Sequence, residues 1–438
     1  MKRYSEYKDS GVKWIGEIPE HWKIAPFGRH FSYGKGLPIT KADLQSEGTP
    51  VISYGQIHSK KNTGTKIDEN LIRYVHPSYI DTNPQSLLKE NDFIFADTSE
   101  DIEGCGNCAY NDINGNIFAG YHTVIARPQN ILFPKYYAYL FQSKNWKTQI
   151  QTLVNGVKVY SINRGILKQS ILLIPQKDEQ EAIVTYLDTK VAKIDEYISI
   201  AEKKIAALEE LKQTIIAEAV TRGIHKDVLM KDSGVKWIGM IPEHWKVMRL
   251  SQIAYEHFIS NKKIHHQNLL SLSYGQIIRK DINGTNGLLP ASFDTYQVVE
   301  EGNIILRLTD LQNDHKSLRV GLVKETGIIT SAYLCLAPKN MVYSKFLYFQ
   351  LHACDIKKVF YSMGDGLRQS LNYDGMRKLA SVIPPLPEQQ EIVTYIEAKV
   401  AKIDQLCQAE RSQIEKLKEY KQRLISDVVT GKVKVTND

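Results

Sequence analysis

The 438-residue sequence has no long hydrophobic run. A membrane-spanning helix needs roughly 18 or more consecutive apolar residues, and no stretch of the chain approaches that length. The N-terminus leads directly into polar sequence, without the apolar segment of a secretion signal. These absences predict a soluble, non-secreted protein. The 42% of apolar residues is enough to build folded cores, which excludes a disordered chain.

Cysteine is scarce, with five residues scattered along the chain. An odd, dispersed set does not suit a disulfide framework and is typical of a reducing compartment, so we expect the protein in the cytoplasm. Cys105 and Cys108 form a Cys-x-x-Cys pair, but no second Cys or His pair stands at the spacing of a zinc site. The pattern favours a buried pair of thiols, and we expect no metal.

Motifs for nucleotide and cofactor chemistry are missing as well. The sequence has no G-x-x-x-x-G-K-[ST] loop for phosphates and no Asn/Asp-Pro-Pro-aromatic motif of a methyltransferase. Residues 104–109 fit G-x-G-x-x-A, but turn-forming residues follow where a dinucleotide site needs a helix. The sequence therefore gives no support for these cofactor chemistries, and a stand-alone enzyme would need a site outside these motifs.

What the sequence does contain is a tandem repeat. Residues 8–23 (KDSGVKWIGEIPEHWK) recur at 231–246 with one substitution. The pentapeptide Ser-Tyr-Gly-Gln-Ile occurs at 53–57 and again at 273–277, and Lys-Val-Ala-Lys-Ile-Asp occurs at 190–195 and at 399–404. The period exceeds 200 residues, so each copy is long enough to own a core. We expect two copies of one unit, related by a pseudo-twofold axis.

Each copy divides into two parts of different character. Residues 1–175 and 227–384 are rich in Gly, Tyr, Asn and short β-favouring runs, which predicts two mixed α/β globules. Residues 176–226 and 385–438 form helical spacers, because apolar residues recur there every seven positions with few helix breakers. The expected fold class is α+β, with two long antiparallel helices that pack along one seam. The seam residues are Leu187, Val191, Ile194, Ile198, Ile205, Leu208, Ile396, Val400, Ile403, Ile414, Leu417 and Leu424.

Three polar residues, Lys212, Glu410 and Lys421, fall at seam positions. A polar residue on a helix seam can fix register at some cost in stability. The alternative is that the helices splay apart or end there.

Charge is distributed unevenly along the repeat. The whole chain carries +7, whereas the helical segments 178–226 and 387–438 carry −3 and 0, which leaves +10 on the globules. A surface that contacts phosphates would therefore have to lie on the globules. A basic face exposed only to solvent is the alternative.

Two short segments repeat at the end of the globules. Gly156-Val157-Lys158 aligns with Gly366-Leu367-Arg368, and Ser161-Ile162-Asn163 aligns with Ser370-Leu371-Asn372. Glycine allows close approach of the backbone to a phosphate, and a neighbouring cation neutralises its charge, so we predict DNA contact there; a simple turn is the alternative. The candidates in and around these segments and in other basic stretches are Lys60, Lys61, Lys158, Ser161, Asn163, Arg164, Arg279, Lys280, Arg307, Arg368, Ser370 and Asn372.

The repeated pentapeptide is a further candidate. Tyr54 and Gln56, like Tyr274 and Gln276, alternate along an apparent strand, which would place both side chains on one face. Glutamine can pair with adenine through two hydrogen bonds, so these four residues are predicted to contact DNA. The alternative is a core strand with the tyrosine packed inward.

The duplicated Asp-Ser-Gly-Val-Lys-Trp-Ile-Gly-x-Ile-Pro-Glu-His-Trp-Lys and the Ile-Pro…Glu-Gln…Ile-Val at the start of each helix resemble the specificity subunits of type I restriction–modification systems. In the first copy Gln-Lys-Asp, at 176–178, replaces the usual Pro-Leu-Pro. The resemblance spans the whole chain.

The resemblance implies a non-catalytic reader of double-stranded DNA. Two target recognition domains would each read one half of a bipartite, asymmetric target, and the helices would set the unread spacer and dock two modification (methyltransferase) subunits. Restriction (motor-nuclease) subunits would join this complex. S-adenosylmethionine, ATP and Mg²⁺ are expected on those partner subunits and none of them in this chain. From the residues alone, a coiled-coil scaffold whose globules bind proteins is the alternative.

Overall fold

The computed structural model describes residues 2–129, 131, 133–156, 159–225, 227–283, 290, 292–311, 318–363 and 370–435. The chain divides into two compact units: unit 1 comprises Met1–Ala201 and Ser412–Asp438, and unit 2 comprises Glu202–Arg411. Each unit therefore holds one globule together with a part of both long helices. Within the described residues, no helix is long and apolar enough to cross a membrane.

Unit 1 is built around an antiparallel sheet. Its strands, in spatial order, are β4 (Phe31–Lys35), β11 (Thr123–Pro128), β7 (Phe93–Ala96) and β9 (Cys108–Tyr110). A second sheet has the order β10 (Phe118–Ala119), β5 (Thr49–Ile52) and β6 (Arg73–Val75), with β10 parallel to β5. The strand pairs are β1 (Tyr7–Asp9) with β2 (Glu17–Pro19), β3 (Lys23–Pro26) with β13 (Ile171–Ile174), and β8 (Thr98–Ser99) with β12 (Tyr160–Ser161).

Short helices connect and cover these strands. They are α1 (Phe27–His30), α2 (Tyr54–Ile57), α3 (Tyr79–Thr82), α4 (Pro134–Gln142), α5 (Lys144–Leu153), α6 (Arg164–Gln169) and the 3-10 turns η1 (Lys41–Asp43), η2 (Glu69–Leu71) and η3 (Pro84–Ser86). An aromatic core joins the central sheet to α4 and α5: Phe27 stacks on Phe31 with ring centroids 4.2 Å apart, and Phe141 lies 4.4 Å from Trp146. Burial of these large rings contributes strongly to the stability of this globule.

Unit 2 repeats the central sheet with the order β17 (Ala254–Glu256), β25 (Leu334–Pro338), β22 (Ile304–Leu306) and β23 (Val320–Leu322). Two strand pairs are β14 (Met230–Asp232) with β15 (Met240–Pro242) and β16 (Lys246–Arg249) with β26 (Ala380–Ile383). A three-stranded sheet has the order β18 (Ile259–Ser260), β21 (Gln297–Val299) and β24 (Gly327–Ile329). The strands β19 (Leu270–Ser273) and β20 (Gln276–Arg279) form a hairpin. The helices of unit 2 are α8 (Leu250–Ile253), α9 (Ser344–Ile356), α10 (Tyr373–Met376), η4 (Asn261–Lys263) and η5 (Val359–Ser362).

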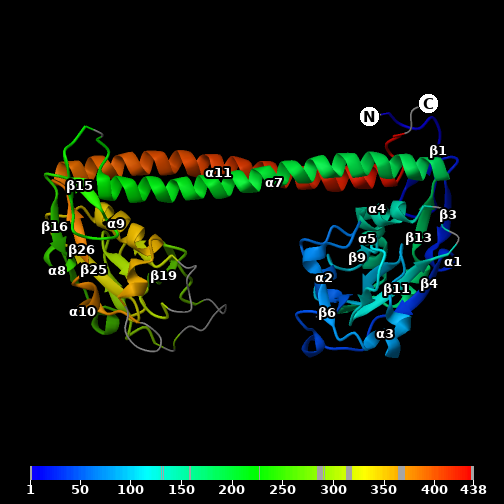
Figure 1. Cartoon of the computed structure of the whole chain (residues 1–438), viewed down its shortest axis with the longest axis horizontal. Coiled ribbons are helices and arrows are strands. Elements are labelled where there is room, and N and C mark those ends of the chain that lie inside the picture. The colour runs from blue at the N-terminus through cyan, green and yellow to red at the C-terminus, as the bar shows by residue number, and fades with distance from the viewer. Residues whose placement is uncertain are drawn as a thin grey trace. The chain divides into compact units, whose positions relative to one another are not determined.

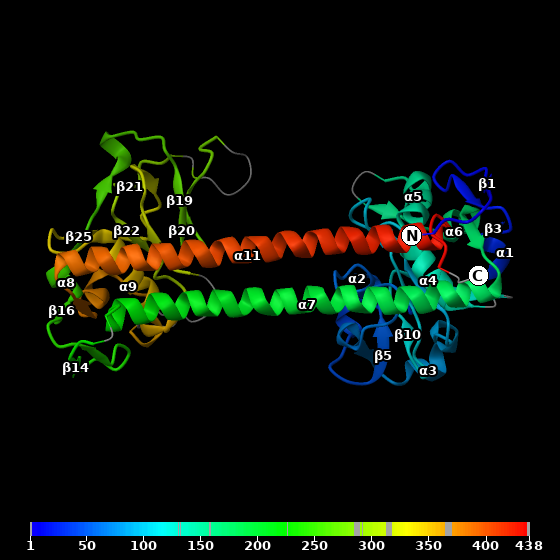
Figure 2. The same ribbon diagram turned by 90° about the horizontal axis from the view of Figure 1, so that it is seen from above.

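Two long helices, α7 (Lys177–Arg222) and α11 (Leu386–Val429), complete both units. Within each unit their segments run antiparallel side by side, over α4 in unit 1 and over α9 in unit 2 (Figure 1 and Figure 2). Of the seam residues, Leu187, Val191, Ile194, Ile396, Ile403, Ile414 and Leu424 are buried, and Ile198, Ile205, Leu208, Val400 and Leu417 are half-buried. The predicted class, mixed globules with a pair of long helices, is confirmed.

The three polar seam residues find partners on the facing helix. Lys421 Nζ lies 2.6 Å from Asp195 Oδ1 in unit 1, and Lys212 Nζ lies 2.7 Å from Asp404 Oδ1 in unit 2. These are the same pair in the two copies of the repeat, because both residues are related by the offset of 209 positions. Glu410 pairs with Lys204 at 2.5 Å. The helices therefore continue through these positions, and the ion pairs fix their register.

The longest repeated motif ties each globule to the helices. In unit 1 the Glu179 carboxylate, in the first turn of α7, accepts hydrogen bonds from His21 Nε2 (2.8 Å) and Trp22 Nε1 (3.1 Å). In unit 2 the Glu388 carboxylate accepts the same bonds from His244 Nε2 (2.8 Å) and Trp245 Nε1 (3.0 Å). We call this arrangement the clasp. It explains why Glu-His-Trp and the Glu-Gln of the helix start recur together.

Candidate nucleic-acid interface

An open pocket in unit 1 collects several of the predicted contact residues. Its lining consists of Lys35, Asp97, Thr98, His122, Thr123, Val124, Ser161, Ile162, Asn163 and Arg164. The pairing of β12 with β8 brings Ser161 to Thr98, and Ile162 N donates a hydrogen bond to Asp97 O at 2.8 Å. Both cations of this pocket, Lys35 and Arg164, are exposed. Two cations beside hydroxyl groups and an amide suit a phosphate backbone and its neighbouring base edges.

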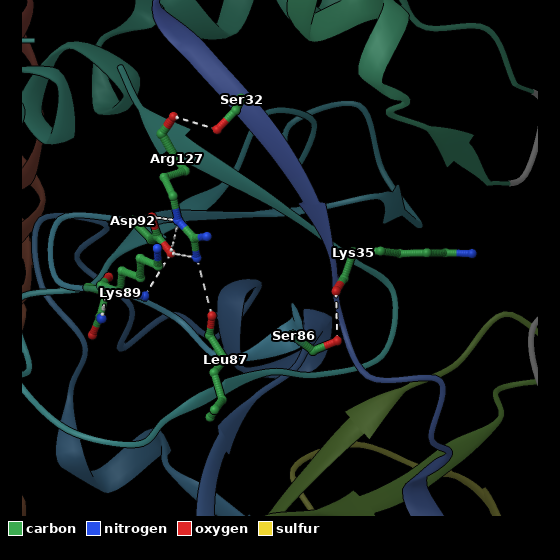
Figure 3. A network of polar contacts seen from close by, with 8 residues as sticks. Ser32, Lys35, Ser86, Leu87, Lys89, Asp92 and Arg127 are labelled. Atoms are coloured by element: carbon green, nitrogen blue, oxygen red, sulfur yellow. Dashed lines mark hydrogen bonds and ion pairs between the residues drawn. The ribbon is translucent and has the colours of Figure 1, made fainter. Parts of the chain in front are cut away.

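Lys35 is held at the pocket by its backbone. It stands between two glycines at the end of β4, and a Cβ on Gly36 would lie 1.9 Å from Gly120 O, so only glycine permits this approach of the two segments. Lys35 O accepts a hydrogen bond from Ser86 Oγ at 2.9 Å. Figure 3 shows that the side chain of Lys35 points away from this contact, which leaves its ammonium group for the pocket.

The segment that supports Lys35 is fixed by an ion pair whose carboxylate is buried. Arg127 donates to the Asp92 carboxylate through Nε (2.9 Å) and Nη2 (2.7 Å), and Asp92 is fully buried (Figure 3). Lys89 N donates to the same carboxylate at 2.8 Å, and Arg127 Nη2 also reaches Leu87 O at 3.2 Å. Because the buried charge is paired and hydrogen-bonded from several sides, it holds residues 86–92 in one conformation.

Two histidines lie around the pocket and have different roles. His122 Nδ1 is 3.2 Å from Asp97 Oδ1, and its backbone is left-handed with φ 54°. Since Nδ1 is engaged with Asp97, Nε2 is the ring nitrogen that remains for a ligand. His58 Nε2 donates to Thr98 O (2.8 Å), and His58 Nδ1 accepts from Asn107 Nδ2 (3.2 Å), so both of its ring nitrogens serve the fold.

The strand predicted for the repeated pentapeptide is wrong in both copies. In unit 1 residues Tyr54–Ile57 form the helical turn α2, because Ser53 caps it and Gln56 Oε1 accepts a hydrogen bond from Ser53 N at 3.1 Å. The Gln56 side chain is therefore folded back on its own backbone. Tyr54 is half-buried, with its ring 5.5 Å from that of Tyr121 and 5.4 Å from that of His122.

In unit 2 the same five residues form the end of a hairpin. Tyr274 and Gly275 have φ 46° and 75° and form the two-residue turn between β19 and β20. Tyr274 is 83% exposed, and Gln276 is exposed on the first position of β20. One local sequence thus adopts a helical turn or a hairpin according to its partners, here a capping serine or a facing strand.

The repeated Ser-x-Asn segment stabilises the local fold and is also a candidate for contact with DNA. Leu371 N donates to Leu308 O at 3.0 Å in unit 2, as Ile162 N does to Asp97 O in unit 1. Asn163 Oδ1 then caps α6 by accepting from Ile166 N (3.0 Å), and Asn372 Oδ1 caps α10 by accepting from Gly375 N (3.1 Å). Both asparagines, like Ser161 and Ser370, remain exposed. Their side-chain amide groups, rather than their oxygens, are the atoms available to DNA.

The remaining candidates fall into four groups. Lys60, Lys61 and Lys280 are exposed, whereas the Arg279 guanidinium lies on the Glu325 carboxylate in a two-bond ion pair. Arg307 is half-buried, and its carbonyl accepts from Arg319 Nη1 (3.0 Å). Lys158 and Arg368 lie outside the described residues.

The cysteine pair is buried, as are the other cysteines. Burial raises the pKa of Cys105 to about 11 and that of Cys108 to about 12. Both thiols are therefore protonated at neutral pH, and neither is a reactive thiolate. Among the described residues, no group of three or more His, Cys, Asp or Glu side chains is arranged to hold a metal ion.

Sequence reasoning missed Lys35, Thr98 and His122, which complete the unit 1 pocket. The Gly-Lys-Gly sequence at 34–36 was a usable signal for Lys35, because flanking glycines allow a close approach. No signal marked the other two residues, since only the pairing of distant strands brings them to residues 161–164.

Comparisons with known proteins agree with this architecture. Residues 19–210 match the family model of the type I restriction modification DNA specificity domain. The putative type I restriction enzyme MjaX specificity subunit of Methanocaldococcus jannaschii is 23% identical over 98% of this chain and 98% of its own length. Over nearly its whole length the chain is therefore similar to type I restriction specificity subunits.

Two solved structures share the fold. A chain from a study of complex assembly and conformational transition of the type I R-M system has a TM-score of 0.67 at 15% identity, covering 95% of this chain and 99% of that one. The HsdS subunit from Thermoanaerobacter tengcongensis has a TM-score of 0.50 at 17% identity, with 95% of this chain and 98% of that one covered. At this level of identity the likeness concerns the fold.

Proposed function

We propose that this chain is the DNA-recognition subunit of a type I restriction–modification complex, in which each unit reads one half of a bipartite, asymmetric target. The observation that carries the proposal is the match to the DNA specificity domain together with the duplication of its framework: the same central sheet, clasp and capped Ser-x-Asn segment occur in both units. Two copies of one framework with different surfaces can read two different half-sites.

The surfaces on which we place the readout differ between the units. In unit 1 the pocket supplies two cations, Lys35 and Arg164, for phosphates, and His122 for a base edge or a bridging water. In unit 2 the exposed hairpin supplies Gln276 and Lys280. A two-stranded ribbon of this kind fits the major groove.

The proposal also covers the other subunits of the complex. Two modification subunits would dock on the helix pair and methylate adenine with S-adenosylmethionine, and restriction subunits would add ATP- and Mg²⁺-dependent translocation and cleavage. This chain would contribute recognition and spacing, and the complex would work in the cytoplasm, where the DNA lies.

A methylation map tests the proposal directly. A host that expresses this chain with its methyltransferase subunits should acquire adenine methylation at one two-part motif, detectable by long-read sequencing. Replacing residues 1–175 with those of another family member should change one half of the motif and leave the other half intact. Absence of any methylated motif, or a change in both halves, would contradict the assignment.

Purified complexes test the unit 1 pocket. The double variant Lys35→Ala, Arg164→Ala should weaken DNA binding and lower the slope of log affinity against log salt by about 1 to 2, because each phosphate contact adds nearly one unit to that slope. Lys13→Ala removes an equally exposed cation of unit 1 outside the pocket and serves as the matched control. Unchanged affinity and slope in the double variant would exclude the pocket from the interface.

A further inference from the structure

The tip of the β19–β20 hairpin presents an aromatic side chain to solvent. At 83%, Tyr274 is the most exposed of the large apolar and aromatic side chains that the structure describes. A single exposed ring is common on protein surfaces, so the exposure of Tyr274 gains meaning only together with its backbone conformation.

The backbone at this tip also disfavours tyrosine. The turn between β19 and β20 has two central residues with positive φ, 46° at Tyr274 and 75° at Gly275. Asn-Gly is the sequence that best suits such a turn, and bulky residues rarely adopt positive φ. The local fold therefore does not explain why a tyrosine occupies this position. Strained backbone conformations of this kind are concentrated at functional sites.

The hairpin beneath the ring is firmly anchored. A Cβ on Gly275 would stand 3.0 Å from Leu318 Cβ, so the tip rests on that side chain. Leu272 and Ile277, which face each other across the hairpin, pack on Gly321 of β23 so closely that a Cβ there would lie 2.6 and 2.8 Å from them. Tyr274 is therefore held outward by a fixed support.

The rest of the hairpin suits nucleic acid. Leu272 and Ile277 face the core, so the alternate positions, Ser271, Ser273, Gln276 and Ile278, lie on the opposite face. This outward face combines hydroxyl groups and an amide with one apolar side chain, the groups that read base edges and thymine methyls. Lys280 ends the hairpin as an exposed cation, and Arg279 neutralises the nearby Glu325.

We propose that Tyr274 enters the base stack of the DNA half-site bound by unit 2, as an aromatic wedge at the tip of the hairpin. This inference rests on the proposed DNA-recognition function. Insertion of the ring between base steps buries it, and apolar side chains that insert in this way unstack and kink the duplex. The equivalent Tyr54 of unit 1 cannot act so, because its ring packs on Tyr121 and His122.

The test uses the full chain in complex with its methyltransferase subunits and a duplex that carries the mapped target. Tyr274→Asn places a residue that favours the turn at the strained position, so the variant should fold at least as well as the parent. Its affinity for the target should fall about 5- to 100-fold, the range for loss of one aromatic stacking contact. Tyr274→Phe keeps the ring and should bind within about 2-fold of the parent. Leu229→Asn removes another highly exposed apolar side chain and should leave binding unchanged.

A second measurement reports the unstacking of the bases directly. The fluorescent base 2-aminopurine, placed at successive positions of the unit 2 half-site, should brighten at one step when the parent complex or Tyr274→Phe binds, and stay quenched with Tyr274→Asn. Parental affinity of Tyr274→Asn, or quenched 2-aminopurine at every step with the parent, would overturn the wedge while the parent still binds its target. Failure of the parent complex to bind any mapped target would instead overturn the DNA-recognition function.

Discussion

Unit 1 and unit 2 share one framework but use the same pentapeptide in opposite ways. Ser-Tyr-Gly-Gln-Ile is a capped helical turn in unit 1, with Tyr54 packed inward, and a hairpin tip in unit 2, with Tyr274 directed to solvent. The clasp and the Lys–Asp pairs between the helices, in contrast, are the same in both units. The comparison shows that repeated sequence preserves geometry only where its tertiary partners are repeated too.

The units also differ in how an arginine supports the sheet. Replacing the arginine of unit 2 is expected to cause the largest loss of stability. In unit 2 Arg319 is fully buried and donates to three carbonyls, among them Thr309 O (2.8 Å) and Asp310 O (3.1 Å). Arg319→Met should lower the unfolding free energy by about 4 kcal/mol, because three carbonyls lose the donor that a fully buried guanidinium supplies. Urea unfolding followed by hydrogen exchange, which reports each unit separately, measures this loss.

Arg127→Met is the counterpart in unit 1. We expect a smaller loss of about 2–3 kcal/mol, because water can reach the half-exposed site of Arg127 and Asp92 keeps the hydrogen bond from Lys89 N. Equal losses in both variants would show that the two arginines support their units alike.

The next comparison concerns the stability cost of replacing the glycines that follow the two long helices. Gly431 has φ 74°, and a Cβ there would lie 2.4 Å from the Pro19 ring; Gly223 has φ 75°, and its Cβ would lie 3.3 Å from Trp245. Gly431→Ala should cost about 3 kcal/mol and Gly223→Ala about 1 kcal/mol, because both strain the backbone but only the first forces a clash. Thermal unfolding of the two variants checks the order, and a reversed order would contradict the packing at the clasps.

Among the described residues, His352 of unit 2 is the one buried histidine, and it makes the stability of this unit depend on pH. Burial, with a smaller contribution from Lys212, lowers the pKa of His352 to about 4, and His352 Nε2 donates to Gln213 Oε1 at 2.8 Å. The unfolded chain therefore binds more protons than the folded chain between about pH 4 and the ordinary value near 6.5, so stability is lost as the pH falls through this window.

His352→Gln removes this titration. From about pH 7 to about pH 5, unit 2 of the parent should lose about 2 kcal/mol more stability than unit 2 of the variant. Hydrogen exchange of α9 at the two pH values measures the difference, with α4 of unit 1 as the internal control. A parallel decline in parent and variant would place the histidine in contact with water.

The smallest effect concerns the helix pair. Lys421–Asp195 in unit 1 and Lys212–Asp404 in unit 2 are equivalent, partly exposed pairs, so each should contribute about 0.5–1 kcal/mol. A double-mutant cycle with Lys→Met and Asp→Asn in each unit measures both coupling energies. Energies above about 2 kcal/mol would mean that the pairs are far less exposed to water than their geometry indicates.

Part of this organisation could be predicted from the sequence, because it depends on local periodicity and self-similarity. The repeat defined two copies, and the seven-residue spacing identified seam residues such as Leu187 and Ile403, which are buried. The Lys212 and Lys421 positions were recognised as polar seam residues, but their partners were not, since a facing helix is not visible in one helix's sequence.

The sequence by itself determined the duplicated framework and the two helices, because apolar spacing, helix breakers and repeated motifs act through near neighbours along the chain. The tertiary structure alone decided which side chains meet. Lys35, His122 and Arg164 come together only through the pairing of β4 with β11 and of β8 with β12. The pentapeptide likewise became a helical turn or a hairpin because each unit offers it different partners, and contacts between distant segments outweigh the weak preferences of five residues.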